Sequence, residues 1–105
     1  TKITLLVKEE GIISLEHAVR AGTSLPATML SIPDRGLIRR GYKADIQVFD
    51  LDELEVKATW TLTNSRAYSE GVHYVLVNGA FALDEESPTY TLAGTTIRNQ
   101  AAWRR

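Results

Sequence analysis

Hydrophobic residues in the first third of the chain recur at the spacing of a short helix. Leu15, Ala18 and Val19 fall on one helical face, with Ser14 before them and Gly22 after them. The Ser14 hydroxyl can accept an amide proton from the first turn, and glycine often marks the end of a helix. The pattern therefore predicts a helix that begins after Ser14 and closes at Gly22.

Two further segments before Pro33 have helical character. A second short helix is predicted to begin at residue 23 or 24, with Pro26 in its first turn, where a missing amide proton costs little. The apolar residues 5–7 are followed by Gly11, which suits a helix C-terminus because glycine adopts the left-handed conformation without steric cost. Two or three short helices are therefore expected before Pro33.

After Pro33 the pattern changes to short strands separated by turn residues. Residues 73–77 read H-Y-V-L-V, the strongest strand signal in the chain, and the Asn78-Gly79 pair that follows favours a type I′ hairpin turn. The expected strands lie at residues 46–49, 58–62, 73–77, 80–83 and 89–92. The predicted fold class is α+β, with the short N-terminal helices followed by a mostly antiparallel small β-sheet.

Composition places the chain among ordinary globular domains. Its 105 residues are 44% hydrophobic and 24% charged, and a chain of this length forms one domain at most. The lack of cysteine excludes disulfides, cysteine-ligated zinc and thiol catalysis. No apolar run approaches the ~20 residues of a membrane helix, so we expect a cytoplasmic protein that contacts no membrane. Because the first residue is Thr1, we also expect a processed or cut product.

Charge is small overall but unevenly spread. The net charge of −1 combines +2 over residues 1–40, −6 over residues 41–92 and +3 over residues 93–105. These segments could pair with one another within one fold. They form no continuous basic face, so nucleic acid is not an expected partner.

Histidine is the only imidazole source for metal binding or base catalysis, and the chain has two. His17 is predicted in the first turns of a helix, and His73 opens a strand. Neither belongs to an H-x-H or H-E-x-x-H motif, so each is expected to be structural or solvated. A zinc site formed by this chain alone is therefore not expected.

Other catalytic sets can be drawn, but none has a supporting motif. Ser65, His73 and Asp84 supply the residue types of a serine hydrolase triad, yet no G-x-S-x-G sequence accompanies them. Asp45 and Asp50 bracket an apolar strand and could act as a paired acid and base. Carboxylates in such places more often bind turn amides, and that is the expectation here.

Two charged clusters near the C-terminus are expected to be solvated. Residues 84–86 read D-E-E at an expected loop tip, and the tail carries Arg98, Arg104 and Arg105. Anion binding by the tail is the alternative. We assign no catalytic, cofactor-binding or metal-ligating residue to this chain.

The most informative stretch is residues 34–50, which read D-R-G-L-I-R-R-G-Y-K-A-D-I-Q-V-F-D. It resembles the D-R-G-x-I-x-x-G-x-x-A-D-x-V-V-F-D segment near the end of metal-dependent amidohydrolases. The residue chemistry agrees with this resemblance. Gly36 and Gly41 free the backbone to turn, Ala44 leaves room for close packing, and Asp45 can cap the turn before a buried strand.

The flanking sequence extends the resemblance over nearly the whole chain. Residues 14–27 resemble the helix pair that precedes the segment in this superfamily. Residues 58–60 (A-T-W), residues 68–79 (Y-S-E-G-V-H-Y-V-L-V-N-G) and residues 94–98 resemble the N-acyl-D-amino-acid deacylase (D-aminoacylase) branch. Dihydroorotases and adenine deaminases share the first segment. Residues 63–66 (T-N-S-R) depart from the branch, which usually has proline there.

This resemblance implies a parent enzyme with a (β/α)8 barrel and a small β-sandwich built from both chain ends. Residues 1–33 would flank the barrel, residues 34–98 would form part of the sandwich, and residues 99–105 would be the tail. The parent's zinc or similar divalent metal would activate water for attack on an amide carbonyl. Its ligands would all precede Thr1, so this chain is expected to be inactive alone. Its partner would be the remainder of its own parent chain, the barrel and the N-terminal sandwich strands.

Two other functions compete with the enzyme-fragment interpretation. One is a stand-alone β-rich binding or interaction module, and the other is a small independent hydrolase. An upstream in-frame sequence of ~350 residues with an H-x-H motif after its first barrel strand would favour the fragment. An isolated fragment is also expected to self-associate through its uncovered helical face or to keep that region mobile.

Overall fold

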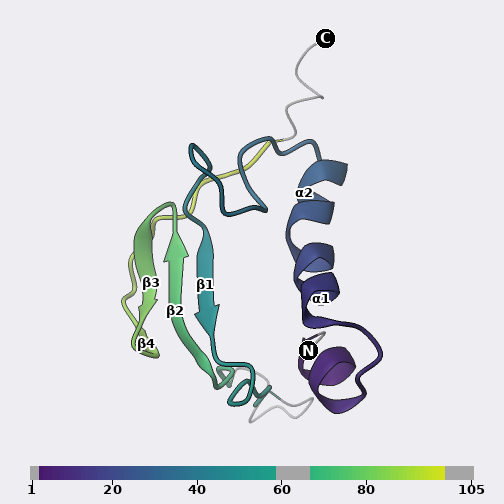
Figure 1. Cartoon of the computed structure of the whole chain (residues 1–105). Helices are drawn as coiled ribbons and strands as arrows, with labels where there is room; N and C mark the ends of the chain where they lie inside the picture. The colour runs from purple at the N-terminus through teal and green to yellow at the C-terminus, as the bar shows by residue number, and fades with distance from the viewer. Residues whose placement is uncertain (1–2, 59–66, 99–105) are drawn as a thin grey trace.

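The computed structural model describes residues 3–58 and 67–98 of the chain. Figure 1 shows the helices in a column beside a sheet, with β1 the strand nearest that column. The elements in chain order are the π-helix η1 (Ile3–Glu9), the helices α1 (Leu15–Gly22) and α2 (Ser24–Met29), and the strands β1 (Ile46–Phe49), β2 (Val72–Val77), β3 (Ala80–Asp84) and β4 (Ser87–Pro88). The predicted α+β class is confirmed.

The helix signals in the sequence are confirmed. The Ser14 hydroxyl accepts a hydrogen bond from the His17 amide at 3.2 Å, and α1 ends at Gly22. Pro26 is the third residue of α2, where its missing amide proton breaks no intrahelical bond. Beyond the end of η1, Gly11 has φ +61°, the left-handed conformation expected of it.

The sheet is antiparallel throughout, in the order β1-β2-β3-β4. Asn78 and Gly79 join β2 to β3 with φ of +49° and +80°. Two central residues with positive φ characterise the type I′ turn, whose twist matches that of the flanking strands. The hairpin predicted at Asn78-Gly79 is therefore confirmed, and the strand predicted at 46–49 is β1.

One predicted strand is wrong. Residues 89–92 form no strand, because the chain turns at residues 85–86 and pairs only Ser87 and Pro88 with β3. Beyond this pairing, Tyr90 has φ +59°, which no extended strand tolerates. The strand predicted at 58–62 falls, from residue 59 onward, outside the described residues.

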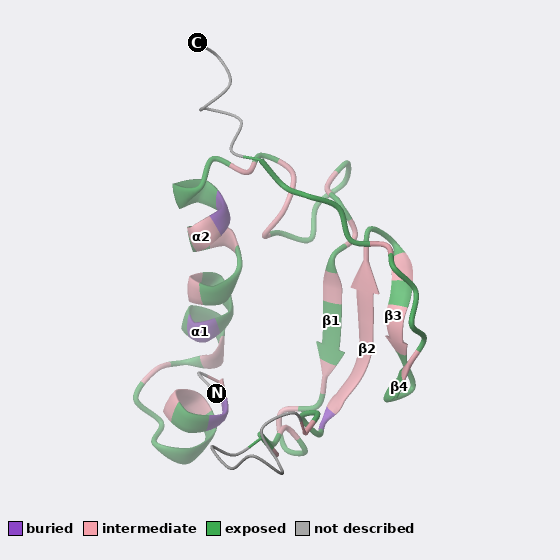
Figure 2. Cartoon of the chain, turned by 180° about the vertical axis from the view of Figure 1, so that it is seen from behind, coloured by how far each residue is buried: buried purple, intermediate pink, exposed green. Residues whose placement is uncertain are grey.

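Burial is shallow across the part of the chain that the structure describes. Its buried hydrophobic residues are Ala18 and Ala27, at 2% and 8% exposure, and all of β2 is half-buried (Figure 2). The accessible surface is 8447 Å², whereas a compact monomer of this length exposes about 5,900 Å². No described helix is long and apolar enough to cross a membrane. The helices and the sheet therefore meet without closing a core of their own.

Candidate functional site

Three charged residues of the 34–50 segment, Asp34, Arg35 and Asp45, join the β2–β3 turn in one hydrogen-bond network, which we call the Arg35 network. The Arg35 guanidinium donates from Nε to Asp45 Oδ2 at 2.7 Å and from Nη2 to Asn78 Oδ1 at 3.0 Å. It also pairs with Asp34 at 3.3 Å. Asn78 donates its backbone amide to Asp45 Oδ1 at 2.8 Å and its side-chain amide to the Ala93 carbonyl at 2.7 Å. The network thus joins three segments that are far apart in sequence.

Asp45 serves this network as an acceptor. The Asn78 backbone amide, and then the Arg35 side chain, hold the pKa of the Asp45 carboxyl below its usual range. Both carboxylate oxygens accept hydrogen bonds within the network. Asp50 likewise accepts the Asp52 amide at 2.9 Å. The expectation that these two aspartates bind turn amides is confirmed.

Gly36 lets the same loop approach helix α2. It has φ +88°, and a Cβ at this position would lie 2.8 Å from both the Ala27 Cβ and the Thr23 carbonyl oxygen. The left-handed backbone and the missing side chain are therefore both needed here. The predicted turn at Gly36 is thereby explained by a close approach to the helix that the sequence did not reveal.

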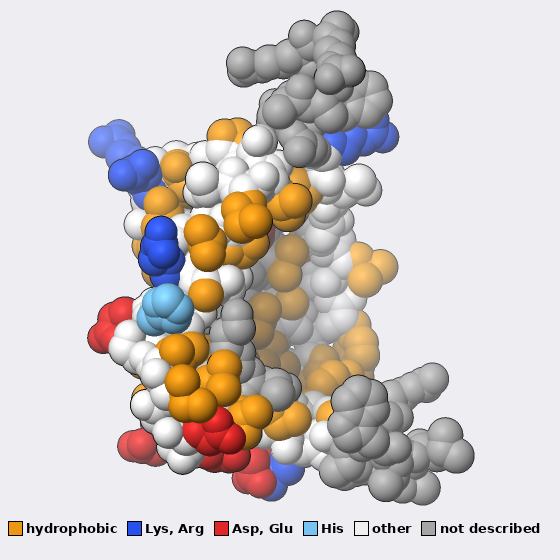
Figure 3. Space-filling model, turned by 90° about the vertical axis from the view of Figure 1, so that its right-hand side faces the viewer, with side chains coloured by type: hydrophobic (Ala, Val, Ile, Leu, Met, Phe, Trp, Pro, Cys, Tyr) orange, Lys and Arg blue, Asp and Glu red, His pale blue; other side chains and the backbone are white. Residues whose placement is uncertain are grey.

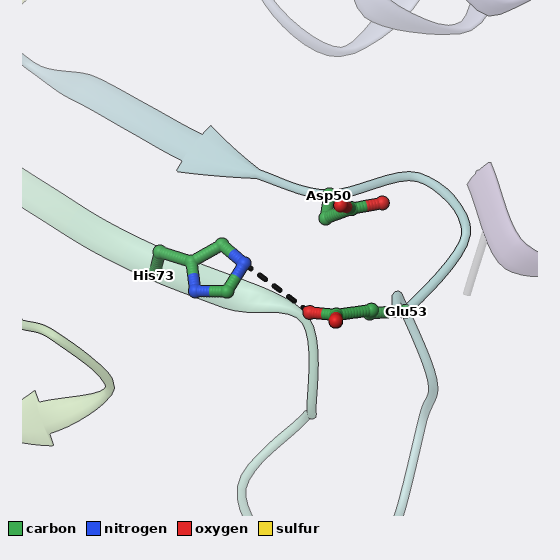
Figure 4. A group of neighbouring side chains, drawn as sticks. All are labelled: Asp50, Glu53 and His73. Carbon is green, nitrogen blue, oxygen red and sulfur yellow. Dashed lines mark ion pairs between the residues drawn. The ribbon is translucent and has the colours of Figure 1, made fainter.

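A second cluster gathers where β1 ends and β2 begins. His73 pairs through Nε2 with Glu53 at 3.3 Å and through Nδ1 with Glu86 at 2.9 Å. Asp50 completes a group whose potential ligand atoms, with those of Glu53 and His73, all lie within 4.8 Å of one another. Figure 4 shows Asp50 beside the His73–Glu53 pair. Among the described residues, this is the one group of three or more carboxylates and imidazoles with such spacing.

Sequence reasoning treated His73 as a lone histidine and gave Glu53 no role. A signal was present, because antiparallel pairing of the predicted strands at 46–49 and 73–77 brings Asp50 close to His73. Glu86 could not be foreseen, since it reaches His73 only through the turn at residues 85–86. The D-E-E stretch is exposed as expected, with Asp84 ending β3 and residues 85–86 forming the turn.

The remaining sequence candidates do not form a catalytic set. Both ring nitrogens of His73 pair with glutamates and not with Asp84, and Ser65 lies outside the described residues. His17 is exposed on α1. Arg104 and Arg105 also lie outside the described part of the chain.

An apolar cleft of about 1200 Å³ separates the helices from the sheet. Figure 3 shows hydrophobic side chains gathered around a hollow on this side of the molecule. The cleft is lined by apolar residues of α1, β1 and β2 and of the loop after β1, among them Leu15, Val19, Ile46, Phe49, Leu54 and Leu76. Val19 is 39% exposed here. Apolar surface of this extent is usual where another polypeptide packs.

Comparison with known proteins gives consistent matches. A family model described as "Amidohydrolase family" matches residues 3–82. N-acyl-D-glutamate deacylase of Alcaligenes xylosoxydans xylosoxydans is 35% identical over 96 residues, which are 91% of this chain and 19% of that protein.

Solved structures match over most of the chain. The crystal structure of D-aminoacylase superimposes with a TM-score of 0.83 at 31% identity, covering 92% of this chain and 20% of that one. N-acyl-D-glutamate deacylase from Bordetella bronchiseptica, complexed with zinc and a phosphonate inhibitor, gives 0.81 and 34% with the same coverage. The chain thus spans about a fifth of the length of these relatives.

Proposed function

Because the chain belongs to the amidohydrolase family, we propose that it is the C-terminal structural portion of a metal-dependent enzyme that hydrolyses C–N (amide) bonds. The substrate class proposed is N-acyl-D-amino acids, since the relatives described above are deacylases of that kind. Within such an enzyme this chain acts as scaffold. It is not catalytically competent alone.

The observation that supports this proposal is the open apolar cleft, together with the shallow burial of the described hydrophobic residues. The helices and the sheet leave about 1200 Å³ between them, and the described hydrophobic side chains include no large one that is fully buried. Covering apolar surface is worth about 25 cal/mol per Å². A few hundred Å² of cover from the rest of the parent chain would therefore contribute several kcal/mol to the stability of the whole.

The parts of the chain have different roles in this proposal. Residues 1–33 contain η1, α1 and α2 and pack beside the (β/α)8 barrel of the parent. Residues 34–98 contribute β1 to β4 to a small composite β-sandwich, which strands from the N-terminal end of the parent complete. Residues 99–105 form the C-terminal tail. The Arg35 network links residues 1–33 to residues 34–98, because Gly36 contacts α2 and the neighbouring Arg35 donates a hydrogen bond to Asn78 in the β2–β3 turn.

We assign the catalytic metal of such an enzyme, zinc or a similar divalent ion, to no pair of histidines in this chain. His17 lies exposed on α1, and the described group with metal-ligand spacing contains His73 on β2 but not His17. The metal and the groups that act on the substrate are therefore supplied by the remainder of the parent. This chain contributes the surface against which that remainder packs.

A split-enzyme experiment tests the proposal. The polypeptide encoded upstream and this chain are expressed separately, and hydrolysis of N-acetyl-D-glutamate and N-acetyl-D-leucine is measured for each and for the mixture. We expect activity from the mixture and none from this chain alone. Val19→Asp should reduce recovery of activity, because it places a charge in the cleft.

His17→Asp is the matched control, since His17 is exposed on the same helix and does not line the cleft. It should leave the recovered activity unchanged. If this chain binds no upstream polypeptide, or if the upstream polypeptide is fully active and stable without it, the scaffold role is wrong. Either outcome would favour the stand-alone module.

A further inference from the structure

We propose that Asp50, Glu53 and His73 bind a divalent transition-metal ion of the zinc type at the junction of β1 and β2. The inference does not depend on the enzyme proposed above. From the sequence alone, His73 was expected to be structural or solvated, because no other ligand stands near it along the chain. The fold brings Asp50 and Glu53 beside it.

The geometry of the three side chains suits one ion. Zinc binds imidazole nitrogen and carboxylate oxygen at about 2.0–2.2 Å in tetrahedral geometry, so ligand atoms around one ion lie about 3.3–3.6 Å apart. The potential ligand atoms here lie within 4.8 Å of one another, so side-chain rotations that move them by about 1 Å would complete the site. Figure 4 shows the gap that they border, between the end of β1 and the start of β2.

The backbone beneath the cluster is fixed by strand pairing. Phe49 pairs with Val72 in the register of β1 and β2, and the Asp50 amide donates to the Gly71 carbonyl at 2.9 Å. Asp50 also accepts the Asp52 amide, which holds one of its oxygens and leaves the other for an ion. Two of the three ligands thus stand on paired backbone.

Glu86, which is not one of the three ligands, contacts the second ring nitrogen of His73. Its carboxylate lies 2.9 Å from His73 Nδ1, and its backbone amide donates to the His73 carbonyl at 3.0 Å. A metal-bound histidine almost always donates its second ring N–H to a carboxylate or carbonyl, which fixes the tautomer and raises ligand basicity. A neutral His73 that donates Nδ1–H to Glu86 would leave the Nε2 lone pair on the side of Glu53, as metal binding requires.

The local charge and the ligand types decide which ion suits the site. Asp50, Glu53 and Glu86 surround a single imidazole. A divalent cation would therefore relieve carboxylate repulsion that His73 alone offsets only when protonated. Imidazole among the ligands favours zinc, nickel or copper over magnesium and calcium, which prefer oxygen throughout.

The two histidines of the chain make the test selective. Zn²⁺ is titrated into the complete chain at neutral pH in a non-chelating buffer, with calorimetry for affinity and imidazole NMR signals for location. We expect one site per chain, with the ring signals of His73 shifted and those of His17 unmoved. Mg²⁺ in excess should not displace Zn²⁺.

The variants separate a built site from adventitious binding. His73→Ala should abolish the site, and Glu86→Gln should weaken it about 10- to 100-fold through the ring orientation. His17→Ala should change nothing. Asp50→Asn and Glu53→Gln keep side-chain shape, so they should lower affinity in protein whose circular dichroism matches the wild type. Absence of saturable binding, retention of binding by His73→Ala, or equal losses in His73→Ala and His17→Ala would overturn the proposal.

Discussion

Removal of the Arg35 side chain should destabilise the chain more than removal of any other arginine in the 34–50 segment. Arg35→Ala deletes the hydrogen bonds to Asp45 and Asn78 and leaves their oxygens without this donor. The Arg35 side chain is 15% exposed and that of Asp45 is 36% exposed. The pair is thus neither deeply buried nor fully exposed to solvent. Its contribution to the free energy of unfolding therefore lies between the contributions of a buried and of an exposed pair.

Hydrogen bonds to charged groups contribute about 1.5–3 kcal/mol when buried, whereas exposed ion pairs contribute about 0.2–1 kcal/mol. Between these limits we expect a loss of about 2 kcal/mol from the free energy of unfolding. For a chain near 100 residues, this lowers the midpoint of thermal unfolding by about 10 °C. The measurement is thermal unfolding followed by circular dichroism, at neutral pH and low salt.

Arg39→Ala is the matched control. Its guanidinium lies 5.8 Å from the Tyr42 ring centroid on an exposed part of the same segment. Such a contact is worth about 0.5 kcal/mol in water, so the control should shift the midpoint by only a few degrees. If the two variants unfold within about 2 °C of each other, Arg35 does not hold the segment to the turn and the reasoning fails.

Three further results are expected. Because the pKa of Asp45 is lowered on folding, its stabilising contribution is complete above the ordinary value of 3.8 and is lost as the pH falls through the lowered pKa. Asp45→Asn should therefore flatten the plot of unfolding free energy against pH, measured between neutral and strongly acid pH. Gly36→Ala should cost about 3 kcal/mol in thermal unfolding, because it combines a left-handed residue with a clash against Ala27, whereas Gly41→Ala, at φ +85° with open space around it, should cost about 1 kcal/mol. The isolated chain should self-associate in sedimentation velocity and Val19→Asp should shift it toward monomer; a monodisperse wild-type monomer would contradict this.

Local signals in the sequence predicted the local structure well. Ser14 caps α1, Gly22 ends it, and the Asn78-Gly79 turn closes the hairpin as expected. Each of these features depends on residues within a few positions of one another, so the chemistry of the residue is enough to predict it. The residue type and place of Asp45 predicted an acceptor of turn amides, but its partner, the Asn78 amide, lies 33 positions away and was not predictable from local sequence.

Features set by distant residues were not predictable in this way. Three segments far apart in sequence build the His73 cluster, and its spacing depends on the register of β1 against β2 and on the turn that carries Glu86. The strand expected at 89–92 failed because Tyr90 adopts a positive φ, for which tyrosine carries no sequence signal. Neither result could come from propensity or spacing alone.

The two ends of the sheet differ in whether another strand can join them. Strand β4 is two residues long and contains Pro88, which has no amide proton to donate, so it blocks growth at that edge. Strand β1 forms the other edge, and within the described residues no strand pairs with its outer side. An incoming strand would therefore add beside β1, next to the apolar cleft. The sheet can therefore be extended only at β1. Its unpaired backbone groups can bind a strand of the parent enzyme or a strand of another copy of this chain, so correct assembly and misassembly compete for the same edge.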